Sequence, residues 1–305
     1  MYRIFFLILI LGNLLLISCN DVEILSDNKQ SAENIIDRLK SFNDSVMLST
    51  PTTRVSSGRW LYLLSVASAD AGGAYAGGVA GAKIGTIIGH PHVGAAIGAI
   101  CCGGYTSYQC HRILSDAGAT RGNLEGETEL KPMEVAAAYA PILKDENTIK
   151  KNYTSNIYLE ETSGDLKSIG AKHNLLLKNL QLKNFDVESV GNLLSSEEKY
   201  VLESDEFEHQ MDSVVNQLQF KINEMKPVQV DGMNVPSRIM NLFFDIFSKF
   251  PENENDVGLI VSKYLEEINS DGSISDTEKQ LIEQSLSVAV SSYEYWKKYY
   301  SDESD

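Results

Sequence analysis

A row of glycines sets the strongest constraint on how this chain folds. The glycines stand mostly four residues apart, on both sides of His90-Pro91-His92: Gly73, Gly77, Gly81, Gly85, Gly89, Gly94 and Gly98. In a helix interior, glycine is about 1 kcal/mol less favourable than alanine. Residues four apart share one helical face, and a glycine face lets a second helix approach to backbone contact. The spacing therefore predicts a glycine-zipper helical hairpin over residues 60–112, broken near Pro91.

Two charged residues bear on the surroundings of this hairpin. Its arms reach the short edge of the length that spans a ~30 Å hydrocarbon core. Asp70 lies near the open end, but Lys83 lies close to the tip and would have to extend to the interface or face protein. The sequence therefore leaves two hypotheses open, a hairpin in a membrane and a Gly/Ala-rich hairpin buried inside a soluble helical domain.

The start of the chain is typical of a secretory signal. Arg3 precedes an apolar run in residues 1–18, and the run ends in Leu16-Ile17-Ser18-Cys19. This ending resembles the lipobox of bacterial lipoproteins, which implies that Cys19 is diacylated and becomes the mature N-terminus. Asn20 follows where an inner-membrane protein would carry Asp, so the resemblance implies sorting to the outer membrane. An ordinary signal peptide and an uncleaved anchor are the alternatives.

Charge limits the classes of partner. The 305 residues are 43% hydrophobic and 22% charged, which is typical of globular domains, and they carry a net charge of -16. Such a charge argues against nucleic acid as a partner and disfavours simple electrostatic docking on anionic lipid. Beyond Cys19 there are three cysteines, Cys101, Cys102 and Cys110, and this odd number predicts a free thiol or a bond between molecules.

The remaining sequence predicts helices joined by linkers. Residues 19–59 predict a lipid tether with one amphipathic helix and a linker, and residues 113–131 predict a second linker. Apolar residues then recur at three-four spacing through residues 132–305, as in the stripe that includes His173 and Leu176. We therefore expect an all-α chain, in which the hairpin is followed by an acidic α-helical bundle domain.

One loop between predicted helices resembles the calcium loop of an EF-hand. Its candidate ligands follow the EF-hand spacing: Glu267, Asn269, Asp271, Ser273, Ser275 and Glu278. Glu267 stands where Asp is normally needed and no second loop pairs with it, so any Ca²⁺ would bind weakly. The alternative is a helix-helix turn in which Ser275 and Glu278 form a capping box.

No catalytic constellation is visible in the sequence. His90 and His92 belong to the hairpin tip, far from the cysteines, and no spacing typical of zinc ligands occurs. His173 on an apolar stripe is typical of a core histidine. We therefore expect a protein that is not an enzyme and has no cofactor beyond a weak Ca²⁺ site.

The lipobox and the repeated GxxxG from Gly73 to Gly85 resemble glycine-zipper lipoproteins of Gram-negative envelopes, and the hairpin is also similar to segments of two-peptide bacteriocins. The resemblance implies a lipid-anchored envelope protein. In it, the hairpin mediates association with membrane or with other copies, and the helical domain binds a partner. The alternative is a membrane-permeabilising, toxin-like protein that inserts the hairpin into a target bilayer.

Overall fold

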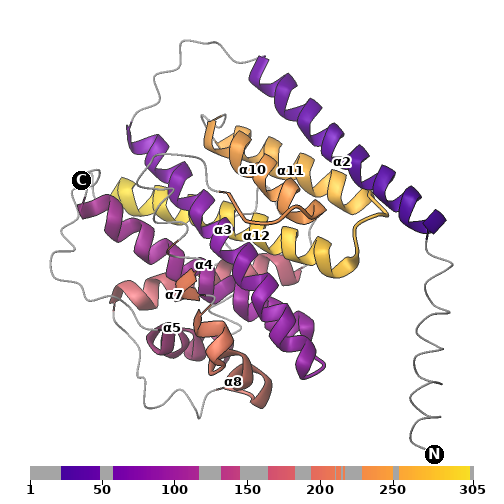
Figure 1. Ribbon diagram of the computed structural model, residues 1–305. Helices are drawn as coiled ribbons and strands as arrows, with labels where there is room; N and C mark the ends of the chain where they lie inside the picture. Colours follow the sequence, from indigo (N-terminus) through magenta and orange to yellow (C-terminus); the bar gives the residue numbers. More distant parts are fainter. Residues whose placement is uncertain are drawn as a thin grey trace, which may run out of the picture.

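A computed structural model gives the structure of the chain. It describes residues 22–48, 58–116, 132–144, 164–182, 194–209, 211–213, 216, 229–249 and 254–302. Every regular element in these ranges is a helix and none is a strand, so the predicted all-α class is confirmed for them (Figure 1). Among the same residues, no helix has the length and hydropathy that crossing a membrane requires.

Two consecutive helices, α3 (Gly58–Ile87) and α4 (Pro91–Asp116), form an antiparallel pair, which we call the α3–α4 hairpin. Gly89 makes the turn between them because its φ of 77° lies in the left-handed region that favours glycine. Its N–H donates to Thr86 O at 3.2 Å, and the N–H of His90 donates to Gly85 O at 2.8 Å. These two bonds are the Schellman pattern that satisfies the last carbonyls of a helix.

Glycines bring the backbones of α3 and α4 into direct contact. A Cβ added at Gly77 or Gly81 would lie under 3.0 Å from the carbonyl oxygen of Gly98 or Gly94, and additions at Gly94 and Gly98 would meet α3 in the same way. A Cβ at Gly85 would lie 2.5 Å from His90 O. Only glycine fits at these positions, because a backbone carbonyl cannot move aside as the end of a side chain can.

Gly89 differs from the other glycines of the row. The sequence pattern placed it on the packing face, but a Cβ there would meet nothing within 4 Å. The reason is that α3 ends at Ile87, so Gly89 belongs to the turn and not to a helix face. The role of Gly73 differs in part, since its nearest neighbour across the pair is the side chain of Thr106 as well as the backbone of Cys102.

The other helices pack on this hairpin or on one another. Their bounds are α2 Val22–Leu48, α5 Pro132–Tyr139, η2 Ala140–Lys144, α7 Gly164–Leu182, α8 Ser196–Leu202, α10 Val235–Lys249, α11 Glu254–Ser270 and α12 Asp276–Asp302. Two apolar clusters result. One joins α3 to α2, α10, α11 and α12, and the other joins α4 to α5, α7 and α8 (Figure 1). The hairpin therefore lies between the two clusters.

Candidate functional site

Buried polar side chains gather where α3, α4, α7 and α12 meet. We call this group the Asp70 cluster; its members are Asp70, Ser107, His173, Asn174, Ser292 and Trp296. Ser292 Oγ donates a short hydrogen bond to Asp70 Oδ2, and Ser107 also bonds the Asp70 carboxyl. Trp296 Nε1 donates to Ser107 Oγ at 3.0 Å. The hairpin and two helices distant from it in the chain, α7 and α12, thus share one polar network in the interior.

His173 is the base of the cluster. Its Nε2 lies 3.7 Å from Asp70 Oδ2, which is beyond hydrogen-bond distance. Its Nδ1 bonds Asn174 Oδ1 at 3.1 Å, while the Asn174 amide nitrogen donates to Ser291 O at 3.0 Å. Asn174 therefore accepts from the imidazole and connects α7 to the backbone of α12.

Burial keeps both titratable groups of the cluster neutral. Removal from water raises the pKa of Asp70 well above its usual value, and the hydrogen bonds from Ser107 and Ser292 offset this only in part. The same loss of hydration lowers the pKa of His173 to about 4. At neutral pH, the imidazole of His173 is thus uncharged, and burial favours the protonated form of Asp70.

The Asp70 cluster has the residue types of a nucleophilic triad but not its arrangement. In a triad, the serine bonds the histidine and the carboxylate orients the histidine from the other side. Here both serines bond the carboxyl group of Asp70. The cluster is also closed to solvent, because the side chains of Asp70, Ser107, His173 and Ser292 are fully buried. No substrate reaches them. The cluster can specify how four helices pack, but it has no face at which to perform chemistry.

The thiols of the hairpin share this burial. Cys101, Cys102 and Cys110 are free and buried, and desolvation raises the pKa of each. The sequence allowed either a free thiol or a bond between molecules, and the structure places all three thiols away from the surface. His111 follows Cys110 on α4, and its Nδ1 lies 2.7 Å from Tyr62 Oη.

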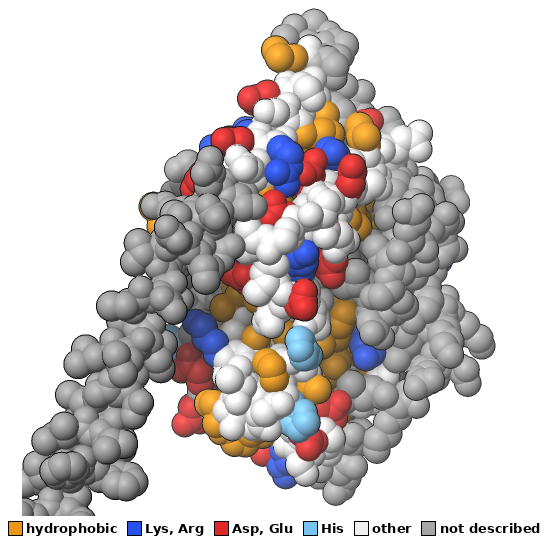
Figure 2. Space-filling model, turned by 90° about the vertical axis from the view of Figure 1, so that its right-hand side faces the viewer, with side chains coloured by type: hydrophobic (Ala, Val, Ile, Leu, Met, Phe, Trp, Pro, Cys, Tyr) orange, Lys and Arg blue, Asp and Glu red, His pale blue; other side chains and the backbone are white. Residues whose placement is uncertain are grey.

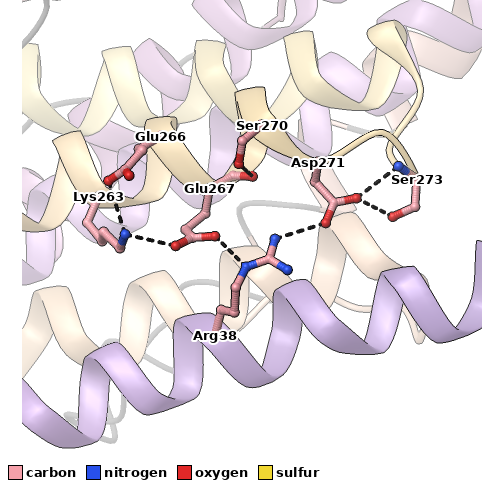
Figure 3. A network of polar contacts seen from close by, with 7 residues as sticks. All are labelled: Arg38, Lys263, Glu266, Glu267, Ser270, Asp271 and Ser273. Atoms are coloured by element: carbon pink, nitrogen blue, oxygen red, sulfur yellow. Dashed lines mark hydrogen bonds and ion pairs between the residues drawn. The ribbon is translucent and has the colours of Figure 1, made fainter.

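A second polar site joins the first helix to the body. Arg38 of α2 donates from Nε to Glu267 Oε2 at 2.5 Å and from Nη2 to Asp271 Oδ2 at 3.0 Å (Figure 3). Lys263 approaches the other oxygen of Glu267 at 2.8 Å. We call Arg38, Lys263, Glu267 and Asp271 the α2 latch. Burial raises the pKa of Glu267 and Asp271, but hydrogen bonds and cations outweigh it, so both pKa values are lowered.

The α2 latch occupies part of the predicted calcium loop. Arg38 and Lys263 neutralise the two carboxylates, and Asp271 Oδ1 accepts from Ser273 N at 2.8 Å (Figure 3). Glu278 Oε2 accepts from Ser275 N at 3.0 Å, and Ser275 Oγ accepts from Glu278 N at 3.4 Å, which is the capping box. Asn269 offers its carbonyl to Lys279. Throughout the described ranges, no three His, Cys, Asp or Glu residues are grouped to hold a metal ion.

The other predicted site residues fall into two groups, those in the hairpin contact and those outside the described residues. Gly77, Gly81, Gly85, Gly94 and Gly98 lie in the hairpin contact. Cys19, with residues 1–18, lies outside the described residues. Comparison with protein-family models, curated proteins and solved structures gave no match to this chain.

Sequence reasoning did not join Asp70 to His173 or Arg38 to Glu267. A signal for the first pair was present, because each is a polar residue on an otherwise apolar helical face, and buried polar groups need one another. For Arg38 the signal was weaker. It lies beside the apolar stripe of a helix whose partner is more than 200 residues away.

Proposed function

We propose that this chain is a lipid-anchored protein of the bacterial envelope, acylated at Cys19 and sorted to the outer membrane, whose helical domain binds a partner. The observation that carries the proposal is the position of α2, which begins at Val22, three residues after Cys19. The α2 latch and the buried Ile35, Ile36 and Leu39 hold this helix on the body. A lipid on Cys19 would therefore be joined to the domain by a helix and not by a long linker.

In this proposal the hairpin serves as the core of the domain and as a contact with membrane. Its glycines meet one another within a single chain, as Gly81 does with Gly94. That geometry favours membrane contact by another part of the hairpin over self-association through the glycine face. If copies associate, we expect them to use surfaces other than the glycines.

We propose a binding role in place of catalysis because of the Asp70 cluster. It brings together an aspartate, a histidine and two serines, and these side chains are buried. The net charge of -16 favours a basic or uncharged protein partner over nucleic acid.

Replacing Cys19 by Ala tests the anchor. In a Gram-negative host, the wild type should float with outer-membrane fractions and yield an acylated N-terminal peptide by mass spectrometry. The Cys19→Ala variant should lose lipid labelling and signal cleavage. An unmodified N-terminus at Asn20 in the wild type would contradict the proposal, and protease treatment of intact cells then tells which side of the outer membrane the domain faces.

A membrane-permeabilising function is the second candidate. The observation that favours it is the apolar end of the hairpin, where Ile87 is 73% exposed. Release of a dye from liposomes distinguishes the two functions. An anchored binding protein should leave the dye inside at any protein-to-lipid ratio that still gives complete binding.

A further inference from the structure

The tip of the α3–α4 hairpin carries apolar side chains in water. Ile87 is the last residue of α3 and is 73% exposed, and Val93 in the first turn of α4 is 38% exposed. Ile88 between them is half-buried. The rest of the hairpin buries its apolar residues between two clusters, so this end differs from the remainder of the same two helices.

The charge of the hairpin differs from that of the whole chain. The chain has a net charge of -16, yet residues 71–115 contain no Asp or Glu. Lys83, His90 and His92 are exposed at or near the tip. His92 Nδ1 bonds Gln280 Oε1 of α12, and His90 lies near Glu197 of α8. Lys83 is therefore the side chain near the tip that we expect to pair with an anion.

The tip lies on the same side of the molecule as the end of α2 that leads to Cys19. In Figure 1, α2 and α3 both run from upper left to lower right, and the N-terminal end of α2 and the end of α3 are the lower-right ends. Figure 2 looks onto this side, and hydrophobic and histidine side chains lie next to one another toward its lower end.

We infer that the hairpin tip is a second membrane contact, in which Ile87, Ile88 and Val93 enter the interface of an anionic phospholipid surface and Lys83 pairs with its phosphates. This inference rests on the proposed lipid anchor. An anionic surface repels the acidic body as a whole, and it repels the hairpin least, because residues 71–115 contain no Asp or Glu. A few apolar side chains bind lipid weakly by themselves, but an acyl chain beside them makes the contact effectively intramolecular.

Depth-dependent quenching tests the contact in the full chain, purified from the membrane fraction and reconstituted into phosphatidylglycerol–phosphatidylethanolamine vesicles. An environment-sensitive dye is attached to Ile87→Cys, and in a matched variant to Leu48→Cys. Leu48 is 86% exposed at the opposite end of α2, so it controls for exposure and labelling. The three native cysteines of the hairpin are buried and stay unlabelled in the folded protein. We expect nitroxide-labelled lipid to quench the dye at residue 87 and not at residue 48.

Flotation separates a failure of the anchor from a failure of the tip. Protein that floats with the vesicles but is not quenched at residue 87 overturns the tip contact and leaves the anchor intact. Protein that does not float overturns both. Lys83→Gln should reduce the inserted fraction about fivefold, since one cation near an anionic surface has an effect of that order. Equal quenching in vesicles of phosphatidylcholine alone would overturn the assignment to anionic lipid.

Discussion

His173 Nε2 faces Asp70 Oδ2 at 3.7 Å, with both side chains fully buried, so an acid and a base share the interior without a hydrogen bond between them. Burial favours the uncharged form of each, and Ser107 and Ser292 bond the carboxyl group of the acid. The stability of the fold should therefore depend on pH through Asp70 and His173, although neither side chain contacts solvent.

Asp70→Asn should stabilise the protein at neutral pH. The folded-state pKa of Asp70 is raised, so its contribution is fully present below the unfolded value of 3.8 and is lost as pH rises toward the folded value. The amide carries no such loss. Urea unfolding should show little difference at pH 3.5 and a gap that widens by up to about 1.4 kcal/mol per pH unit above pH 4. A constant gap at all pH values would contradict a raised pKa of Asp70.

The two buried histidines should produce an acid limb in the stability curve, that is, a loss of folding stability as pH falls. Burial lowers the pKa of His111 and of His173 to about 4 from 6.5, so the unfolded state takes up protons that the folded state refuses. Each histidine should cost on the order of 3 kcal/mol as pH falls from 6.5 to 4. Asp70 acts in the opposite direction over that window, so the limb should be steeper in Asp70→Asn. Replacement of His209, which is exposed, serves as the control.

Gly81→Ala should destabilise the fold although alanine is the better helix former. The added methyl would overlap the Gly94 carbonyl, and such overpacking costs about 1–3 kcal/mol. Gly272→Ala is the matched control, because a Cβ at Gly272 meets nothing within 4 Å. It should be neutral or stabilising by up to about 1 kcal/mol. Thermal melts of the two variants should therefore move in opposite directions, and a stabilised Gly81→Ala would mean that the helix faces are not in contact.

Arg38→Met should loosen α2 at neutral pH by about 1 kcal/mol, since Arg38 is partly exposed. The pKa values of Glu267 and Asp271 are lowered in the fold, so their contribution is present above pH 4.5 and is lost as pH falls. The gap between wild type and variant should narrow as pH falls below 4.5. Arg238→Met, which removes the guanidinium that pairs with Glu33, should have a smaller effect.

Calcium provides a second readout on the same variant. In the wild type, Arg38 and Lys263 already neutralise the loop carboxylates, so millimolar Ca²⁺ should leave the melting temperature unchanged. Arg38→Met frees both carboxylates from the guanidinium, and Ca²⁺ should then raise the melting temperature. A shift in the wild type would show that the ion displaces the arginine.

Local rules predicted the helices and the glycine contact well. Gly77 and Gly81 reveal themselves because repeated glycines in a helix need a neighbouring backbone, and the antiparallel partner follows from the break at Pro91. The spacing of Ser275 and Glu278 likewise indicated a capping box as the alternative to a calcium loop, and both of its hydrogen bonds are present. Gly89 shows the limit of periodicity, because the row of glycines runs past the helix end and spacing alone does not say where a helix stops.

Contacts between distant segments could not be predicted from one sequence. Arg38 could have paired with many acids in a chain of this charge, and nothing local selects Glu267. The meeting of Asp70 with His173 depends on which helices cover the hairpin, which in turn depends on the complementary shapes of several apolar faces. A pattern predicts that a face is buried but not against which partner.

The order of synthesis gives the α2 latch a consequence for folding. Arg38 and Glu267 are separated by 229 residues, whereas Gly81 of α3 meets Gly94 only 13 residues later in the chain. Closing a long loop costs more entropy than closing a short one, and chains form near contacts first. Ribosomes make α2 before the other described helices, yet its binding surface on α11 exists only when nearly the whole chain has been made. The earliest of the described helices to be synthesised is therefore the last to dock.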